Sequence, residues 1–153
     1  MRHLRSALLG AAAVLGCATP ALAGGISVSG AQLRPSMGAS RNTAGYLTIT
    51  NRGAAPDRLL VAGCACAERV EAHRSSASGG MAGMAPAGPV AIPPRGAVAF
   101  RPGGLHLMVT GLKAPLKEGA AQEMTLRFER AGTVKARFAV TSRIPAAPLE
   151  HHH

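Results

Sequence analysis

Short segments in which apolar and polar residues alternate follow one another along most of the chain, and Gly, Pro, Asn and Asp separate them. In the clearest segment, 134–140, apolar side chains occupy every second position and Lys135 and Arg137 lie between them. A period of two with one polar face is typical of antiparallel strands that bury one side. Eight or nine strands at roughly ten-residue spacing predict an all-β sandwich or barrel. The expected strands are 26–29, 46–50, 58–62, 69–73, 90–92, 97–101, 105–110, 124–128 and 134–140.

The composition agrees with one small β-rich domain. Of 153 residues, 47% are apolar, which suffices for a single core, while 19 Gly and 11 Pro leave little room for long helices. The excess of 17 Lys and Arg over 7 Asp and Glu raises the question of a nucleic-acid partner. The basic residues are spread along every strand, however, and aromatic residues on which bases could stack are nearly absent. We therefore expect a solubilising basic surface and no nucleic-acid partner.

The first residues have the pattern of an export signal. Segment 1–23 joins Arg2 and Arg5 to the apolar run 7–16 and ends in Ala-Leu-Ala, which is typical of a cleaved secretory signal peptide. The apolar run is too short for a permanent membrane span. We expect a periplasmic protein without stable membrane insertion, and lipid anchoring at Cys17 is the alternative.

The last residues, 149–153, read Leu-Glu-His-His-His and look like the start of a purification tag. The functional domain is therefore expected at 24–148. Within it, His73 and His106 are the remaining histidines, which limits the candidates for imidazole chemistry. No paired carboxylates, catalytic triad or phosphate loop is evident, so we expect a binding protein and not an enzyme.

Four residues form the candidate site: His73, Met84, His106 and Met108. His106 and Met108 lie two positions apart on an expected strand and so share a face, while the Leu and Val residues between and beside them would fill the core. His73 ends another expected strand. Met84 falls in 75–88, a stretch rich in Ser, Ala, Gly, Met and Pro whose composition predicts a mobile loop.

The kinds of ligand indicate the metal. Thioether sulfur is a soft, neutral donor that suits Cu(I) and holds Zn²⁺ or Mg²⁺ poorly, and imidazole also suits copper. The alternative for each residue is structural, since methionine often fills core gaps and a strand histidine is often merely packed. Met124, on an alternating strand, is assigned to the core, and Met37 and Met81 stay open as further ligands.

The spacing His-x10-Met-x21-His-x-Met resembles the signature of the PCu(A)C family, periplasmic copper chaperones that serve the CuA centre of cytochrome c oxidase. Most of the chain from about 26 to 141 takes part in the resemblance. Many family members carry a further Met two residues after the first histidine, where this chain has Ser75. Besides the four candidate residues, the resembling runs are 44–51, 55–59, 70–73, 92–96, 102–108 and 111–119.

The resemblance implies a cupredoxin-like Greek-key β-sandwich with a surface site that holds one Cu(I) through His73, Met84, His106 and Met108. Binding of Cu(II) at the same site stays open. It further implies delivery of copper to oxidase subunit II or to an assembly factor, and we expect the protein to be a monomer. A copper storage or resistance protein without a dedicated acceptor is the first alternative.

Cys64 and Cys66 are the second chemical feature of the sequence. A Cys-x-Cys pair on a strand places both sulfur atoms on one face. In an oxidising compartment the pair could be incidental, form a disulfide, bind a second Cu(I) or exchange thiols. A Cys-x-Cys thiol reductase is therefore the second alternative function.

Overall fold

The computed structural model describes residues 25–78 and 81–145, and the expected signal segment, Cys17 and residues 149–153 lie outside these ranges. The described residues form ten strands and no helix, so they contain no helix that could cross a membrane. The strands are β1 (Ile26–Leu33), β2 (Asn42–Asn51), β3 (Asp57–Cys64), β4 (Ala67–Ser78), β5 (Met81–Pro86), β6 (Val90–Ile92), β7 (Gly96–Phe100), β8 (Leu105–Leu112), β9 (Ala121–Phe128) and β10 (Gly132–Val140).

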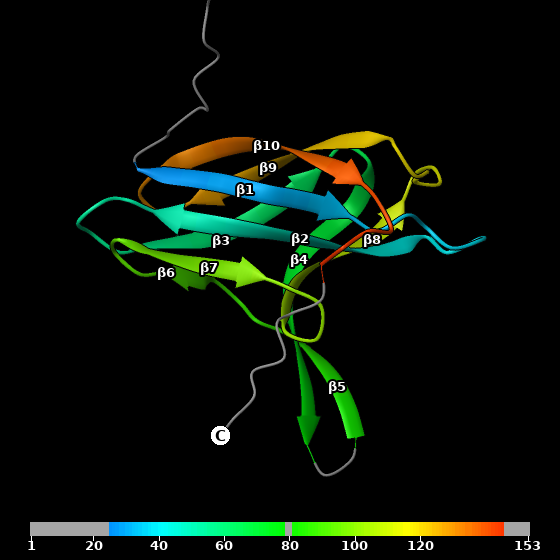
Figure 1. The fold of residues 1–153 in the computed structure, drawn as a ribbon, viewed down its shortest axis with the longest axis horizontal. Helices are drawn as coiled ribbons and strands as arrows, with labels where there is room; N and C mark the ends of the chain where they lie inside the picture. Colours follow the sequence, from blue (N-terminus) through cyan, green and yellow to red (C-terminus); the bar gives the residue numbers. More distant parts are fainter. Residues whose placement is uncertain (1–24, 79–80, 146–153) are drawn as a thin grey trace, which may run out of the picture.

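The strands pair into one sheet that closes on itself (Figure 1). The order β4-β8-β2-β1-β10-β9-β3 returns to β4 through the pairing of Ala62 with Val70. Neighbouring strands are antiparallel except β1 and β10, which run parallel. β5, β6 and β7 add to β4, β3 and β2 respectively. The expected cupredoxin-like, all-β architecture is therefore confirmed, with a barrel-like closure.

The core lies inside this closed sheet and follows the period of two. In β10 every second side chain from Val134 to Val140 is buried, and β9 shows the same alternation. Met124 is fully buried, which confirms its assignment to the core. The largest fully buried side chains come from strands all round the sheet: Phe100, Phe138, Ile26, Leu33, Leu47, Ile49, Ile92, Leu107, Met124, Leu126, Val109 and Val140.

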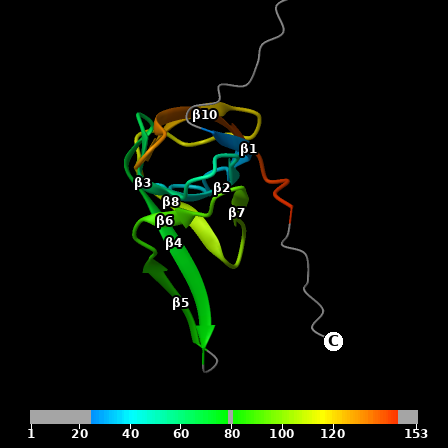
Figure 2. The ribbon, with the colours of Figure 1, turned by 90° about the vertical axis from the view of Figure 1, so that its left-hand side faces the viewer.

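The stretch 75–88, which the sequence predicts as a loop, is mostly strand, and this prediction is wrong. β4 continues to Ser78, and β5 pairs with it antiparallel from Ser78–Met81 back to His73–Pro86. We call this two-stranded extension of the sheet the β4–β5 arm, and it projects from the barrel in both views (Figure 1, Figure 2). Backbone hydrogen bonds hold such a ladder whatever the side chains are, so composition alone missed it. The arm accounts for ten strands where eight or nine were expected.

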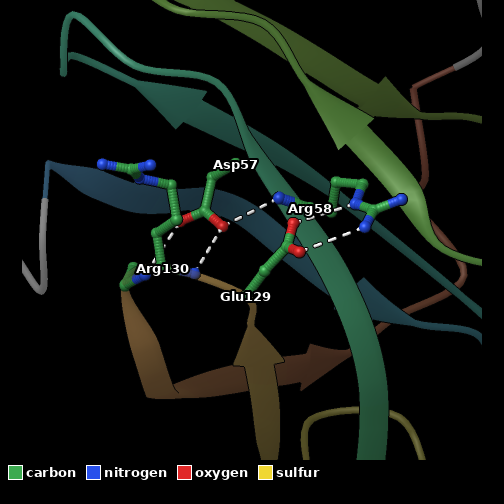
Figure 3. A network of polar contacts seen from close by, with 5 residues as sticks. Asp57, Arg58, Glu129 and Arg130 are labelled. Atoms are coloured by element: carbon green, nitrogen blue, oxygen red, sulfur yellow. Dashed lines mark hydrogen bonds and ion pairs between the residues drawn. The ribbon is translucent and has the colours of Figure 1, made fainter.

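A buried carboxylate joins the start of β3 to the β9–β10 turn (Figure 3). Asp57 is 4% exposed and accepts hydrogen bonds of 2.8–2.9 Å from the backbone N–H groups of Arg58, Arg130 and Ala131. Burial opposes its charged form, but these hydrogen bonds outweigh that effect and lower the pKa of Asp57 below its ordinary value of 3.8. Beside it, Arg58 and Glu129 form an exposed two-pronged ion pair.

Candidate metal centre

β8 supplies the first two candidate residues. Its alternation turns Leu105, Leu107 and Val109 into the core, so His106 and Met108 point to the outer face of the sheet, as the sequence predicts. His106 is nevertheless only 4% exposed. A histidine covered this completely on an outer face needs partners for both ring nitrogens.

One of these partners is the carbonyl of Gly104, which lies 3.0 Å from His106 Nδ1. Because a carbonyl oxygen can only accept, Nδ1 carries the hydrogen in the neutral ring and Nε2 keeps a lone pair. The preceding turn makes this contact, and Gly103 within it has a φ of 80°, a conformation that favours glycine. The Pro-Gly-Gly run before His106 therefore fixes which nitrogen can bind a ligand.

His106 Nε2 faces the sulfur of Met84 at 3.1 Å. Met84 lies on β5 directly opposite Ser75 of β4, so the β4–β5 arm brings a residue 22 positions away onto the imidazole. The thioether has no hydrogen to donate, and two lone-pair donors therefore meet. Met84 is 55% exposed, whereas His106 is covered, so solvent reaches this pair from the Met84 side.

His73 lies directly opposite His106 in the β4–β8 ladder. The two ring centroids are 6.2 Å apart and the planes are tilted by 52°. Both nitrogens of His73 are buried without a hydrogen-bond partner, and Glu71 Oε2 lies 3.5 Å from Nε2. Two buried nitrogens without a partner are a costly arrangement that a bound ligand would relieve.

Glu71 is the residue of this face that the sequence analysis did not single out. It lies two positions before His73, so the two share a face, and it pairs with Met108 across the ladder. The same period-two argument that joined His106 to Met108 would have found it. Its carboxylate adds a hard oxygen donor beside the imidazole.

Met81 and Met37, the two methionines left open as further ligands, lie apart from this cluster, whereas Met108 belongs to it. Met81 is three positions from Met84 on β5, so it points to the opposite side of the strand, and it is 79% exposed. Met37 lies between β1 and β2 and is 83% exposed. Met108 is partly buried on the same face as His106. Of the methionines in residues 25–78 and 81–145, Met84 and Met108 therefore share the face of the two histidines.

The donor set is suited to a soft ion. Among residues 25–78 and 81–145, no three His, Cys, Asp or Glu side chains converge as a harder cation would require. Two imidazoles and two thioethers instead form a neutral, soft set. The assignment of His73, Met84, His106 and Met108 as metal ligands stays a prediction.

The Cys-x-Cys pair of the sequence adopts one of the alternatives considered for it, the disulfide. Cys64 and Cys66 form a disulfide across the β3–β4 turn, with Cα atoms 5.0 Å apart.

Comparison with known proteins gives a family and a set of structural neighbours. Residues 26–140 match the model of the LpqE-like family, described as "Putative lipoprotein LpqE-like". "Putative lipoprotein Lxx21020" of Leifsonia xyli subsp. xyli (strain CTCB07) is 31% identical over 112 residues, which are 72% of this chain and 66% of that protein. The chain thus spans slightly less than two thirds of this relative's length.

The solved structures that share this fold include two with bound copper. The "Copper-bound PCuAC domain from PmoF2" superposes with a TM-score of 0.67 at 28% identity and covers 78% of this chain and 94% of that domain. The "Solution structure of CuI-DR1885 from Deinococcus Radiodurans" has a TM-score of 0.62 at 34% identity. The match covers 75% of this chain and 77% of that chain. The chain therefore belongs to the LpqE-like family, and the PCuAC domain recognised in its sequence is confirmed.

Proposed function

We propose that this protein is a copper chaperone that binds one Cu(I) through His73, Met84, His106 and Met108. The observation that carries the proposal is the contact between His106 Nε2 and Met84 Sδ at 3.1 Å. The Gly104 carbonyl holds the proton on the other nitrogen, so a nitrogen and a sulfur lone pair face one another. A soft cation between them, with the nitrogens of His73 nearby, would use both. The copper carried by the PmoF2 and DR1885 structures supports this choice of metal.

The same geometry supports transfer and not catalysis. The four ligands are neutral, and Met84 is more than half exposed on the β4–β5 arm. An acceptor could approach from this side and replace the thioethers one at a time with thiolates or imidazoles, which bind Cu(I) more strongly. The carboxylate of Glu71 beside His73 favours a second binding mode for Cu(II), which prefers nitrogen and oxygen donors.

The acceptor we propose is the CuA centre of cytochrome c oxidase subunit II, or an assembly factor that precedes it, met by a monomer of this protein. The proposed location is the periplasm. Both matched descriptions are of lipoproteins, which supports a lipid anchor at Cys17. The alternative is release of the protein after cleavage of the signal peptide at residue 23. Replacing Cys17 by Ser distinguishes these: an anchored protein leaves the membrane fraction, and a released one does not change.

An anaerobic Cu(I) titration against a chromophoric chelator tests the site. The chain should lack residues 149–153 and carry Cys17→Ser, because terminal histidines and a thiol bind copper unaided. We expect one tight equivalent, retained when Cys64 and Cys66 are both changed to Ser. Binding that disappears with these two cysteines would contradict the His and Met assignment.

Mixing the loaded protein with a copper-free CuA domain separates delivery from storage. A chaperone should transfer its copper within minutes and generate the CuA absorption, whereas a storage protein should retain it. The storage alternative is favoured if copper moves no faster than from the chelator alone.

A further inference from the structure

The disulfide between Cys64 and Cys66 lies apart from the His and Met cluster. It closes the β3–β4 turn, and His73 lies six positions beyond Ala67, the first residue of β4. At ~3.3 Å per residue this places the sulfurs about 20 Å from the imidazole of His73. The disulfide itself is therefore separate from the proposed copper ligands, although the groove that reaches it is also lined by Glu71.

The bond contributes little to holding the fold together. It closes a loop of three residues, and the entropy removed from the unfolded chain grows with loop length, so the gain here is near the minimum for any disulfide. The tight turn between β3 and β4 already brings Cys64 and Cys66 together. A disulfide with so small a structural effect can open and close while the domain stays folded.

A groove of about 470 Å³ leads to the disulfide from the surface. It exists because β3 and β4 pair at a single position, Ala62 with Val70, so the hairpin is splayed around that point. Its wall includes the exposed apolar side chains of Leu60 and Val61. Cys64 is among the residues that line the groove and Cys66 is not, so we expect an incoming sulfur to meet Cys64.

The backbone around the turn distinguishes the two sulfurs in the same way. The N–H of Cys66 donates to Cys64 Sγ at 3.1 Å. In the reduced protein we expect this N–H to remain beside the Cys64 sulfur and to support its thiolate, which is the reactive form. Cys64 is thereby both the cysteine that lines the groove and the one whose negative charge this N–H would support.

We propose that Cys64 and Cys66 form a thiol–disulfide exchange site whose substrate is a dithiol or cystine on an extended peptide segment that enters this groove. The splayed edges of β3 and β4 offer backbone groups to an extended chain, and the apolar wall suits its side chains.

The exchange balances as two displacements. A substrate thiolate attacks Cys64 Sγ, the bond to Cys66 breaks, and Cys66 leaves as a thiolate that takes up a proton. The second substrate thiolate then attacks the substrate sulfur of the mixed disulfide and releases the Cys64 thiolate. The substrate dithiol is oxidised by two electrons and the protein disulfide is reduced. In the reverse direction, the protein with Cys64 and Cys66 reduced to thiols transfers two electrons to a substrate cystine, which is reduced while the protein disulfide forms again.

Trapping the mixed disulfide tests the roles of the two sulfurs. The full chain with Cys17→Ser is reduced with dithiothreitol, freed of reductant and of copper, and treated with oxidised glutathione; mass spectrometry follows the adduct. We expect Cys66→Ser to accumulate a stable adduct on Cys64, and Cys64→Ser to react at least about tenfold more slowly. Equal rates in the two variants, or a disulfide that native protein keeps in excess dithiothreitol, overturn the proposal.

A second pair of variants tests the groove. Val61→Arg places a charge on its wall, and Thr133→Arg adds the same charge on an exposed position of β10. With a short peptide that contains an internal cystine, we expect Val61→Arg to slow exchange about fivefold or more and Thr133→Arg to leave it unchanged. With oxidised glutathione, both variants should match the parent. If Val61→Arg exchanges the peptide at the parent rate, the groove is not the substrate site.

Discussion

Two buried polar centres of this molecule have opposite hydrogen-bond states. Asp57 and His106 are equally buried, at 4% exposure. Asp57 receives three backbone hydrogen bonds, and both its oxygens are used. In the other centre, His106 Nε2 faces a thioether and both nitrogens of His73 lack a partner. Buried polar groups in proteins are usually paired, so the unpaired nitrogens of the second centre support the proposal that a ligand binds there.

The energetic difference supports the same interpretation. A buried polar atom without a partner costs about 1–3 kcal/mol, whereas the paired carboxylate gains from each charged hydrogen bond. A protein keeps such a cost where a ligand relieves it. Under the proposed function, the His73–His106 centre binds copper and the Asp57 centre is structural, and each of the following changes tests that division.

The largest effect is expected from His106→Ala. Loss of the one nitrogen whose lone pair is fixed toward Met84 should lower Cu(I) affinity about a thousandfold, equivalent to ~4 kcal/mol. Competition titration measures it. Because His106 is buried, Met84→Leu serves as a second variant that keeps volume at an exposed position and removes only the sulfur; it should weaken binding about tenfold or more. Unchanged affinity in both variants would remove these residues from the site.

Met124→Ala should cost stability alone. Its side chain projects from β9 into the core and is fully buried. Truncation to Ala leaves a cavity, so the free energy of unfolding should fall by about 3 kcal/mol. Denaturant unfolding measures the loss, and copper affinity of the folded variant should stay within twofold of the parent. A large drop in affinity would show that methionines in this protein are not separable into core and ligand classes.

Asp57→Asn should lower stability by about 2 kcal/mol and leave copper binding unchanged. The amide group replaces one accepting oxygen by a donor, which opposes the N–H of Ala131 or of Arg58 and Arg130. Chemical denaturation at neutral pH checks the loss. An equal stability of the two proteins would contradict the structural role of this centre.

The same variant gives a pH test with a defined sign. The folded pKa of Asp57 is below its ordinary value of 3.8, so ionised Asp57 stabilises the folded state. The stability difference between parent and Asp57→Asn should be constant from pH 7 to about pH 5 and shrink as pH falls below 3.8 through the folded pKa. A difference that grows in acid would contradict this sign.

The smallest effect is expected from Ser75→Met. Ser75 lies opposite Met84 on the arm. It is two residues after His73, at the position where many members of the PCu(A)C family have methionine. A further thioether there should raise Cu(I) affinity by less than about tenfold, since one weak neutral donor is added to a set already complete. The same titration measures it, with Ser76→Met as the control, because Ser76 points to the other side of β4. Equal gains in both variants would indicate non-specific binding by the arm.

Sequence patterns predicted much of this fold for a local reason. All nine expected segments are strands, because burial of one face imposes a period of two that is legible in residues such as those of β10. Composition failed at 75–88, where small residues have weak strand preference but the pairing of β5 with β4 supplies the hydrogen bonds.

The types of donor and their shared faces were determined by the sequence itself, because positions two apart on a strand always point the same way. Only the tertiary structure decided that His73 stands opposite His106 and that the β4–β5 arm brings Met84 to Nε2. It also decided that Cys64 and Cys66 are joined beside a groove. These features depend on the register between strands distant in the chain, which the packing of the whole core sets and no local pattern contains.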